Sequence, residues 1–153
     1  MNSPTSHVTV DSLDISIATT TTTWLRRLKL SLFKRRASYA NVVILEGVTG
    51  AGSSYLLEKL VPATSILDLQ LLARIDPKHL SEAIAPTGPV GINEPAALDP
   101  EALAAIISLT QDRDQQLVLR TQSLGKLISQ LLPNMRRAGN DRRLLVAHVA
   151  PAV

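Results

Sequence analysis

From residue 41 onward the chain alternates between short apolar runs and segments with leucines at helical spacing. The first run, NVVILE at 41–46, is rich in β-branched residues and precedes a glycine-rich turn, which is typical of a strand buried on both faces. Further apolar runs follow at 65–69, 89–93, 116–121 and 143–149. Strands that alternate with helices predict an α/β fold, a three-layer arrangement in which helices cover both faces of a parallel sheet.

The segments between these runs carry helix start and stop signals. Pro62 ends a first helix, and Asp99 with Pro100 gives a third one an N-cap followed by proline at the first helical position. We expect helices at 53–61, at 71–84 with an interruption at Asp76-Pro77, at 100–109 and at 124–137.

The positive charge of the chain lies near its start. Residues 1–40 hold six Lys and Arg against two acids, whereas residues 41–153 hold ten against eleven. Residues 1–23 are rich in Ser and Thr and predict mostly loop, with one short edge strand as the alternative. We therefore expect two parts: a flexible, basic N-terminal arm at 1–40 and a domain at 41–153.

Within the arm, residues 24–37 (WLRRLKLSLFKRRA) predict a basic, imperfectly amphipathic helix with Trp24, Leu25, Leu28 and Leu32 on one arc. One interpretation is that the leucine face docks on the domain while the charges stay in water. The other is a contact with nucleic-acid phosphates or an anionic membrane surface, with a mitochondrial transit segment as a minor option. The contact residues would be Arg26, Arg27, Lys29, Lys34, Arg35 and Arg36.

Composition excludes several classes of protein. The absence of Cys excludes a disulfide framework, a Cys-based zinc site and a Cys nucleophile. An aromatic content of 3% argues against RNA readers that stack bases on aromatic side chains. No apolar run reaches about 18 residues, so we expect no membrane-spanning helix.

The turn after the first strand, GVTGAGSS at 47–54, has the pattern of a phosphate-binding loop. Glycines let successive N–H groups surround phosphate oxygens, the following helix points its positive end at the anion, and the Ser54 hydroxyl can bind Mg²⁺. Ser53 stands where such loops carry Lys. The alternative is a connector that only permits close strand–helix packing. The candidate nucleotide-binding residues are Gly47, Thr49, Gly50, Ala51, Gly52, Ser53 and Ser54.

Two other strands end in polar residues. The run at 89–95, PVGINEP, looks like a Walker B element in which Asn93 replaces the metal-holding Asp and Glu94 keeps the position of the Glu that polarises water. The run at 116–124, QLVLRTQSL, ends its strand in Thr121-Gln122-Ser123. Each of these alone is also what a strand end with a polar turn looks like.

Together the three segments resemble the RecA-like core of DNA-pumping P-loop ATPases: conjugative coupling proteins, chromosome-segregation translocases and zonula-occludens-toxin-like phage assembly ATPases. The family pattern is a G-x-x-G-x-G-K-S loop, an apolar strand ending in Asp-Glu and an apolar strand ending in Thr-Gln. This chain has GVTGAGSS, PVGINEP and LVLRTQS in that order, over about residues 41–150. The resemblance implies that the strand at 116–121 lies between the other two.

The resemblance also implies ATP or GTP with Mg²⁺ as ligand, Glu94 and Gln122 as catalytic residues, and Ser54 and Asn93 at the metal. Ser53 in place of Lys and Asn93 in place of Asp each remove a charge that stabilises the triphosphate or its metal, so we expect weak binding and slow or absent hydrolysis.

The resemblance further suggests an accessory factor of plasmid or phage DNA transfer, cytoplasmic or peripheral at the inner membrane face, acting as a homo-oligomer or beside a larger ATPase. The alternative function is a non-enzymatic interaction module that keeps the fold and binds nucleic acid or a membrane surface through its basic arm.

Overall fold

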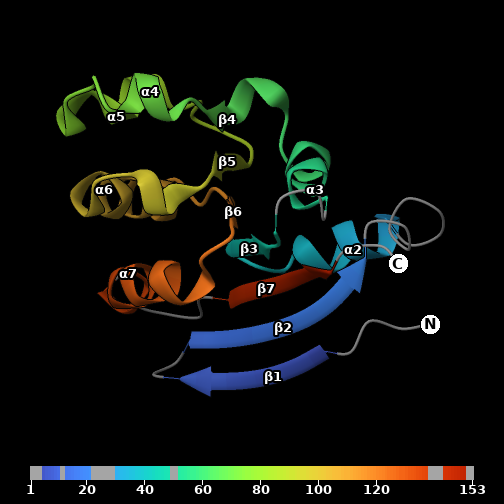
Figure 1. The fold of residues 1–153 in the computed structure, drawn as a ribbon. Helices are drawn as coiled ribbons and strands as arrows, with labels where there is room; N and C mark the ends of the chain where they lie inside the picture. Colours follow the sequence, from blue (N-terminus) through green and yellow to red (C-terminus); the bar gives the residue numbers. More distant parts are fainter. Residues whose placement is uncertain (1–4, 11–12, 22–29, 49–51, 138–142, 151–153) are drawn as a thin grey trace.

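The computed structural model describes residues 5–10, 13–21, 30–48, 52–137 and 143–150. They form one sheet of seven strands in the order β1-β2-β7-β3-β6-β5-β4 (Figure 1). Six strands are parallel, and β1 pairs antiparallel at one edge. The strands are β1 (Thr5–Val10), β2 (Leu13–Thr21), β3 (Val42–Glu46), β4 (Ile66–Leu67), β5 (Val90–Asn93), β6 (Leu117–Thr121) and β7 (Arg143–Ala150).

Helices cover both faces of the sheet, which confirms the predicted α/β class. Figure 1 shows α2 and α3 on one side and α4, α5, α6 and α7 on the other. The helices are α2 (Leu30–Ala37), α3 (Ser53–Leu60), α4 (Leu69–Leu72), α5 (Leu80–Ala83), α6 (Pro100–Asp112) and α7 (Leu124–Arg137), with short 3₁₀ helices at Ala63–Ser65, Pro77–His79 and Pro95–Ala97. No helix in the described part of the chain is long and apolar enough to cross a membrane.

The alternation of side chains along β3 explains why its sequence is continuously apolar. Val42 and Ile44 enter the core under α6 and α7, whereas Val43 and Leu45 enter the core under α2 and α3. All four are at most 2% exposed. Each such side chain contributes about 1.5–3 kcal/mol by leaving water, so β3 holds both layers to the sheet.

The helix predicted at 71–84 is replaced by two shorter helices. Asp68 caps α4 early, accepting a hydrogen bond from the Gln70 N–H at 2.9 Å. The Asp76 carboxylate then accepts from the Lys78 N–H at 3.1 Å and starts a new turn before α5. Two acidic side chains that bind nearby main-chain N–H groups therefore divide the segment, because such bonds favour helix starts over helix interiors.

The N-terminal region differs most from its prediction. The expectation of mostly loop at 1–23 was wrong, because β2 pairs with β7 from Asp14↔Arg143 to Thr21↔Ala150 and β1 adds a further strand. Isoleucines and threonines favour strands once a partner edge is present. These two strands belong to the same sheet as β3, β4, β5, β6 and β7.

The helix of this region docks through a different face from the predicted one. Phe33 and Ala37 are buried in the core with α3, whereas Leu32 is 47% exposed. The side chains of Lys34, Arg35 and Arg36 are exposed, as expected for the charged face. Arg26, Arg27 and Lys29 lie outside the described residues, together with the rest of the leucine arc.

Candidate functional site

The candidate site lies where β3, β6 and β5 end side by side at their carboxyl ends. The helices after β3 and β6 leave toward opposite faces, since Leu56 and Leu57 of α3 pack in one core and Leu127 and Leu131 of α7 pack in the other. Open α/β sheets bind ligands at this kind of switch point. The strand order also confirms that the strand ending in Thr121 lies between the two others.

The turn between β3 and α3 needs glycine at two positions. A Cβ on Gly47 would lie 3.1 Å from the Val149 carbonyl oxygen and 3.2 Å from Ser53 Oγ, so a side chain there would disturb the packing. Gly52 has a φ of 97°, which favours glycine. Thr49, Gly50 and Ala51 lie outside the described residues.

The start of α3 differs from the starts of α4 and α6. Asp68 and Asp99 cap those two helices with carboxylates, whereas Gly52 gives α3 no side-chain cap. The first-turn N–H groups of a helix carry partial positive charge and need acceptors. At α3 this positive end faces the turn that the sequence predicted to bind phosphate.

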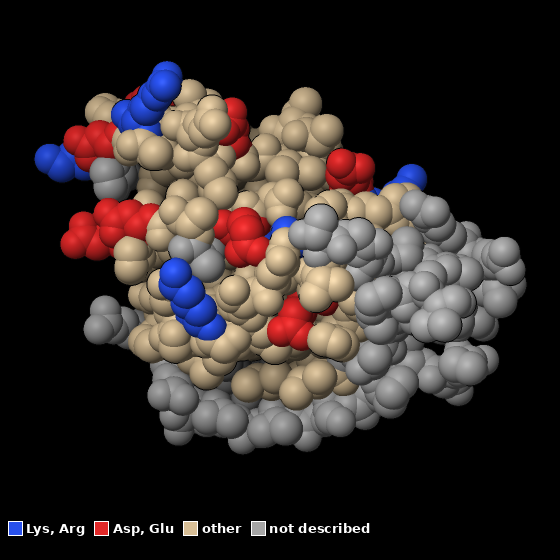
Figure 2. All heavy atoms as spheres, viewed as in Figure 1, with Lys and Arg blue, Asp and Glu red and all other residues tan. Residues whose placement is uncertain are grey.

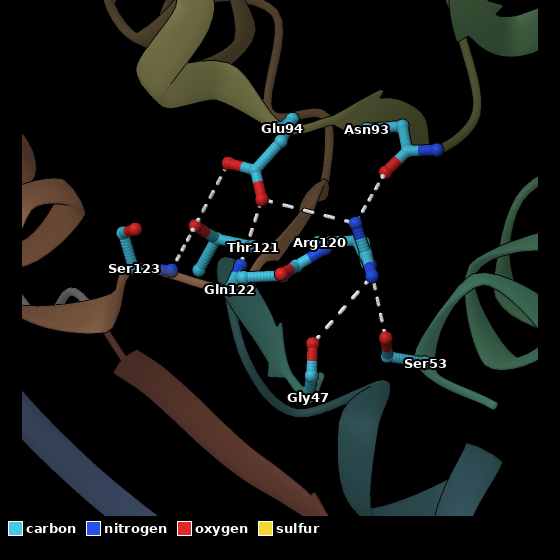
Figure 3. Close-up of polar contacts among 8 residues, drawn as sticks. All are labelled: Gly47, Ser53, Asn93, Glu94, Arg120, Thr121, Gln122 and Ser123. Atoms are coloured by element: carbon cyan, nitrogen blue, oxygen red, sulfur yellow. Dashed lines mark hydrogen bonds and ion pairs between the residues drawn. The ribbon is translucent and has the colours of Figure 1, made fainter. Parts of the chain in front are cut away.

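Arg120 is the residue that sequence reasoning missed. Its Nε–H donates to Ser53 Oγ at 2.9 Å, its Nη1 to Asn93 Oδ1 at 3.4 Å, and its Nη2 to the Gly47 carbonyl oxygen at 3.5 Å (Figure 3). The residue is 7% exposed and therefore joins all three predicted segments beneath the surface. The signal was available, because an arginine inside an apolar strand requires polar partners when it is buried.

Glu94 is held tightly although its side chain is 34% exposed. One carboxylate oxygen accepts from the Thr121 hydroxyl at 3.1 Å, and the other accepts from the Gln122 N–H at 2.8 Å and lies 3.7 Å from Arg120 Nη1. The residue has a φ of 61°, a left-handed backbone that costs a non-glycine residue about 1–2 kcal/mol. The surrounding contacts therefore fix the carboxylate at the end of β6.

The other predicted catalytic residue, Gln122, reaches Glu94 through its main chain. Its N–H donates to the carboxylate, while its side chain is exposed. The Ser123 N–H in turn donates to the Thr121 hydroxyl at 2.9 Å, where α7 begins. The two residues are therefore neighbours, and the main chain of Gln122 positions Glu94.

A second polar pair borders the turn. His148 near the end of β7 contacts the carboxylate of Glu46, which directly precedes Gly47. The His148 side chain is 52% exposed and that of Glu46 is 19% exposed. The pair ties β7 to β3 and places a second carboxylate at the entrance to the turn.

The residues predicted to hold Mg²⁺ form a poor donor set. The Oδ1 atom of Asn93 already accepts from Arg120, and Ser54 is exposed on α3. Mg²⁺ prefers carboxylate oxygens in an octahedral arrangement. Within the described ranges, no group of three or more His, Cys, Asp or Glu could hold a metal ion.

Charged side chains do not gather into one broad area on the face seen in Figure 2. Among the described residues of that face, blue and red side chains are scattered between tan ones.

Comparisons with family models, with curated proteins and with solved structures give no significant match. The function is therefore argued from the geometry of the site.

Proposed function

We propose that this protein is a P-loop-type nucleotide-binding protein that holds the phosphates of ATP or GTP at the carboxyl ends of β3, β6 and β5. The observation that carries the proposal is the Arg120 guanidinium, which contacts Ser53 Oγ and the Gly47 carbonyl oxygen beside the start of α3. A guanidinium and a helix N-terminus both attract anions, and phosphate is the anion that each binds commonly.

The same geometry supports slow or absent hydrolysis. A general base must present a free lone pair to the attacking water, and its orientation must suit the bound substrate. The Glu94 carboxylate instead accepts hydrogen bonds from Thr121 and Gln122 and faces the charge of Arg120. These contacts hold the carboxylate toward the end of β6, so we expect turnover to be low even when nucleotide is bound.

Calorimetry and thermal melting with millimolar ATP or GTP test the proposal. Binding should release or absorb measurable heat and raise the melting temperature, because a ligand that binds only the folded state stabilises it. A protein that shows neither heat nor a melting shift with either nucleotide would overturn the proposal and favour the non-enzymatic interaction module.

A charge variant locates the binding site. Ser54 lies exposed in the first turn of α3, where a carboxylate suits the helix dipole but repels phosphate. Ser54→Glu should therefore leave the melting temperature unchanged or slightly raised and weaken ATP binding by about tenfold or more. The matched control is Ser108→Glu on the exposed side of α6, which adds the same charge away from the site. Equal loss of binding in both variants would argue against this location.

A further inference from the structure

We infer that the site binds the phosphate groups of a nucleotide without a divalent cation, with Arg120 as the positive charge that replaces both the loop lysine and Mg²⁺. This inference rests on the proposed function and deepens it by naming the form of the ligand, a metal-free nucleoside polyphosphate. Three observations on Arg120 and its neighbours support it.

The first observation is where the guanidinium lies. Its Nε–H bonds Ser53, the residue at the lysine position of the loop, and its Nη1 bonds Asn93, the residue at the metal-holding position of the second strand. One side chain from β6 therefore occupies the space between the two positions where the family pattern has charges and this chain has none. Both positions that lack the expected charge therefore lie next to the same guanidinium.

The second observation is that the surroundings oppose a divalent cation. A metal ion between Ser54 and Asn93 would lie beside a buried guanidinium, and arginine keeps its positive charge in proteins. Burial strengthens the repulsion between the two cations, because little water separates them. The nearby carboxylate of Glu94 is engaged by Thr121, Gln122 and Arg120 and is not directed at a metal.

The third observation is the chemistry of the group itself. A guanidinium is planar and can donate two parallel hydrogen bonds to one phosphate. The three oxygens that accept hydrogen bonds from Arg120 here are neutral, and the Glu94 carboxylate lies 3.7 Å from Nη1. The bonds of Arg120 to Asn93 Oδ1 and the Gly47 carbonyl are long, at 3.4 and 3.5 Å. A phosphate oxygen would be a stronger acceptor than either.

The metal dependence of ATP binding tests the inference directly. Wild-type protein is titrated with ATP in excess EDTA and again in excess Mg²⁺. We expect binding in EDTA, and binding weaker by about threefold or more in Mg²⁺, because the metal neutralises the triphosphate and is repelled by Arg120. Binding that requires Mg²⁺ would overturn the inference and leave the proposed function standing, whereas no binding under either condition would overturn both.

Removing the guanidinium tests whether Arg120 supplies the positive charge that binds the phosphates. Arg120→Met should weaken binding of metal-free ATP by about tenfold or more. The control Arg74→Met, which removes an exposed arginine beyond the edge strand β4, should leave it unchanged.

The double variant Ser53→Lys/Arg120→Met returns one cation to the same space from α3, and it should regain most of the lost affinity. It also keeps the inference testable if Arg120→Met does not fold, since the introduced ammonium group can pair with Glu94. Full affinity in folded Arg120→Met, or a folded double variant that binds only with Mg²⁺, would overturn the inference.

Discussion

The two ends of the sheet differ in the polar side chains that they use. At the amino ends, side-chain amides bind main-chain groups of the adjoining loops. Gln116 Nε2 donates to the carbonyls of Ala37 and Ala40 at 2.7 and 3.0 Å, and Gln115 Nε2 donates to those of Ala85 and Gly88 at 2.7 and 3.0 Å. Asn41 Oδ1 likewise accepts from the Arg143 N–H at 2.8 Å.

At the carboxyl ends, charged side chains bind one another and neighbouring polar side chains, and two of them also bind main-chain groups: Arg120 the Gly47 carbonyl and Glu94 the Gln122 N–H. Arg120 bonds Ser53 and Asn93 and faces Glu94, Glu94 accepts from Thr121, and His148 contacts Glu46. One of these residues, Glu94, also has a left-handed backbone. This end therefore brings a buried guanidinium and carboxylates together, whereas the side-chain amides at the other end form neutral bonds.

This difference indicates at which end of the sheet a side chain can exchange its present partner for a ligand. A neutral amide that satisfies a loop carbonyl cannot leave without exposing an unsatisfied group, so the amino-end bonds serve the fold. A charged side chain gains a stronger acceptor when it exchanges a neutral oxygen for a ligand of opposite charge. Loss of the amino-end amide bonds should therefore lower stability, and changes to the carboxyl-end charges should alter nucleotide binding or hydrolysis.

The largest effect is expected for the helix that the amino-end bonds hold in place. Phe33→Ala empties a buried position of α2 and should lower the free energy of unfolding by about 3 kcal/mol. Leu32→Ala on the exposed side of the same helix should change it by about 0.5 kcal/mol or less. Urea unfolding of both variants gives the comparison, and equal effects would mean that α2 is not docked through Phe33.

Gln116→Leu should have the next largest effect, because it leaves the carbonyls of Ala37 and Ala40 without their side-chain donor. We expect a loss of about 1–3 kcal/mol in unfolding free energy and unchanged ATP affinity. Gln70→Leu, at an exposed position of α4, controls for the substitution itself. A stable Gln116→Leu protein with impaired ATP binding would contradict the division between the two ends.

Glu94→Gln changes the carboxyl end while keeping its shape. The ion pair with Arg120 is long and partly exposed, so the unfolding free energy should fall by only about 0.5–1 kcal/mol. Any slow ATP hydrolysis should disappear, because Asn93 cannot act as a base, while nucleotide affinity should stay within about threefold. Phosphate release and calorimetry measure the two quantities, and hydrolysis that survives would remove Glu94 from the catalytic role.

The smallest effect is expected when glycine replaces a residue with a left-handed backbone at each end of the sheet. Asp114, in the turn before β6, has a φ of 54° and an exposed side chain. Asp114→Gly should raise the unfolding free energy by about 0.5 kcal/mol or less, since glycine adopts this backbone without strain. Glu94→Gly relieves similar strain but removes the hydrogen bonds of the carboxylate, so the unfolding free energy should fall. Thermal melting of the two variants shows whether the strain at Glu94 is held by those bonds.

The sequence by itself determined the strands and most of the helices of residues 41–150. Apolar runs, prolines and Asp caps act over a few residues, and their signals do not depend on distant parts of the chain. Gly52 likewise meets a local demand, a φ of 97°, whereas the demand on Gly47 includes the Val149 carbonyl oxygen of β7. The resemblance of the three polar segments to P-loop ATPases also implied the position that β6 has between β3 and β5.

Only the tertiary structure decided how the N-terminal region joins the fold. Whether β2 forms a strand depends on the free edge of β7, about 130 residues further along the chain. The buried face of α2 was likewise decided by the surface below it. Helical spacing alone predicted that Leu32 would be buried. In the structure, Phe33 and Ala37 are the buried residues of this helix.

The tertiary structure also decided what lies at the centre of the candidate site. The sequence shows an arginine in an apolar strand, yet it does not show which face of β6 that arginine occupies or what it meets there. Ser53, Asn93 and Arg120 are distant in sequence and become neighbours because three parallel strands end together. A charge that is missing at one position can therefore be supplied by a residue of another strand. Local sequence patterns cannot show this, because the two residues are distant in the sequence.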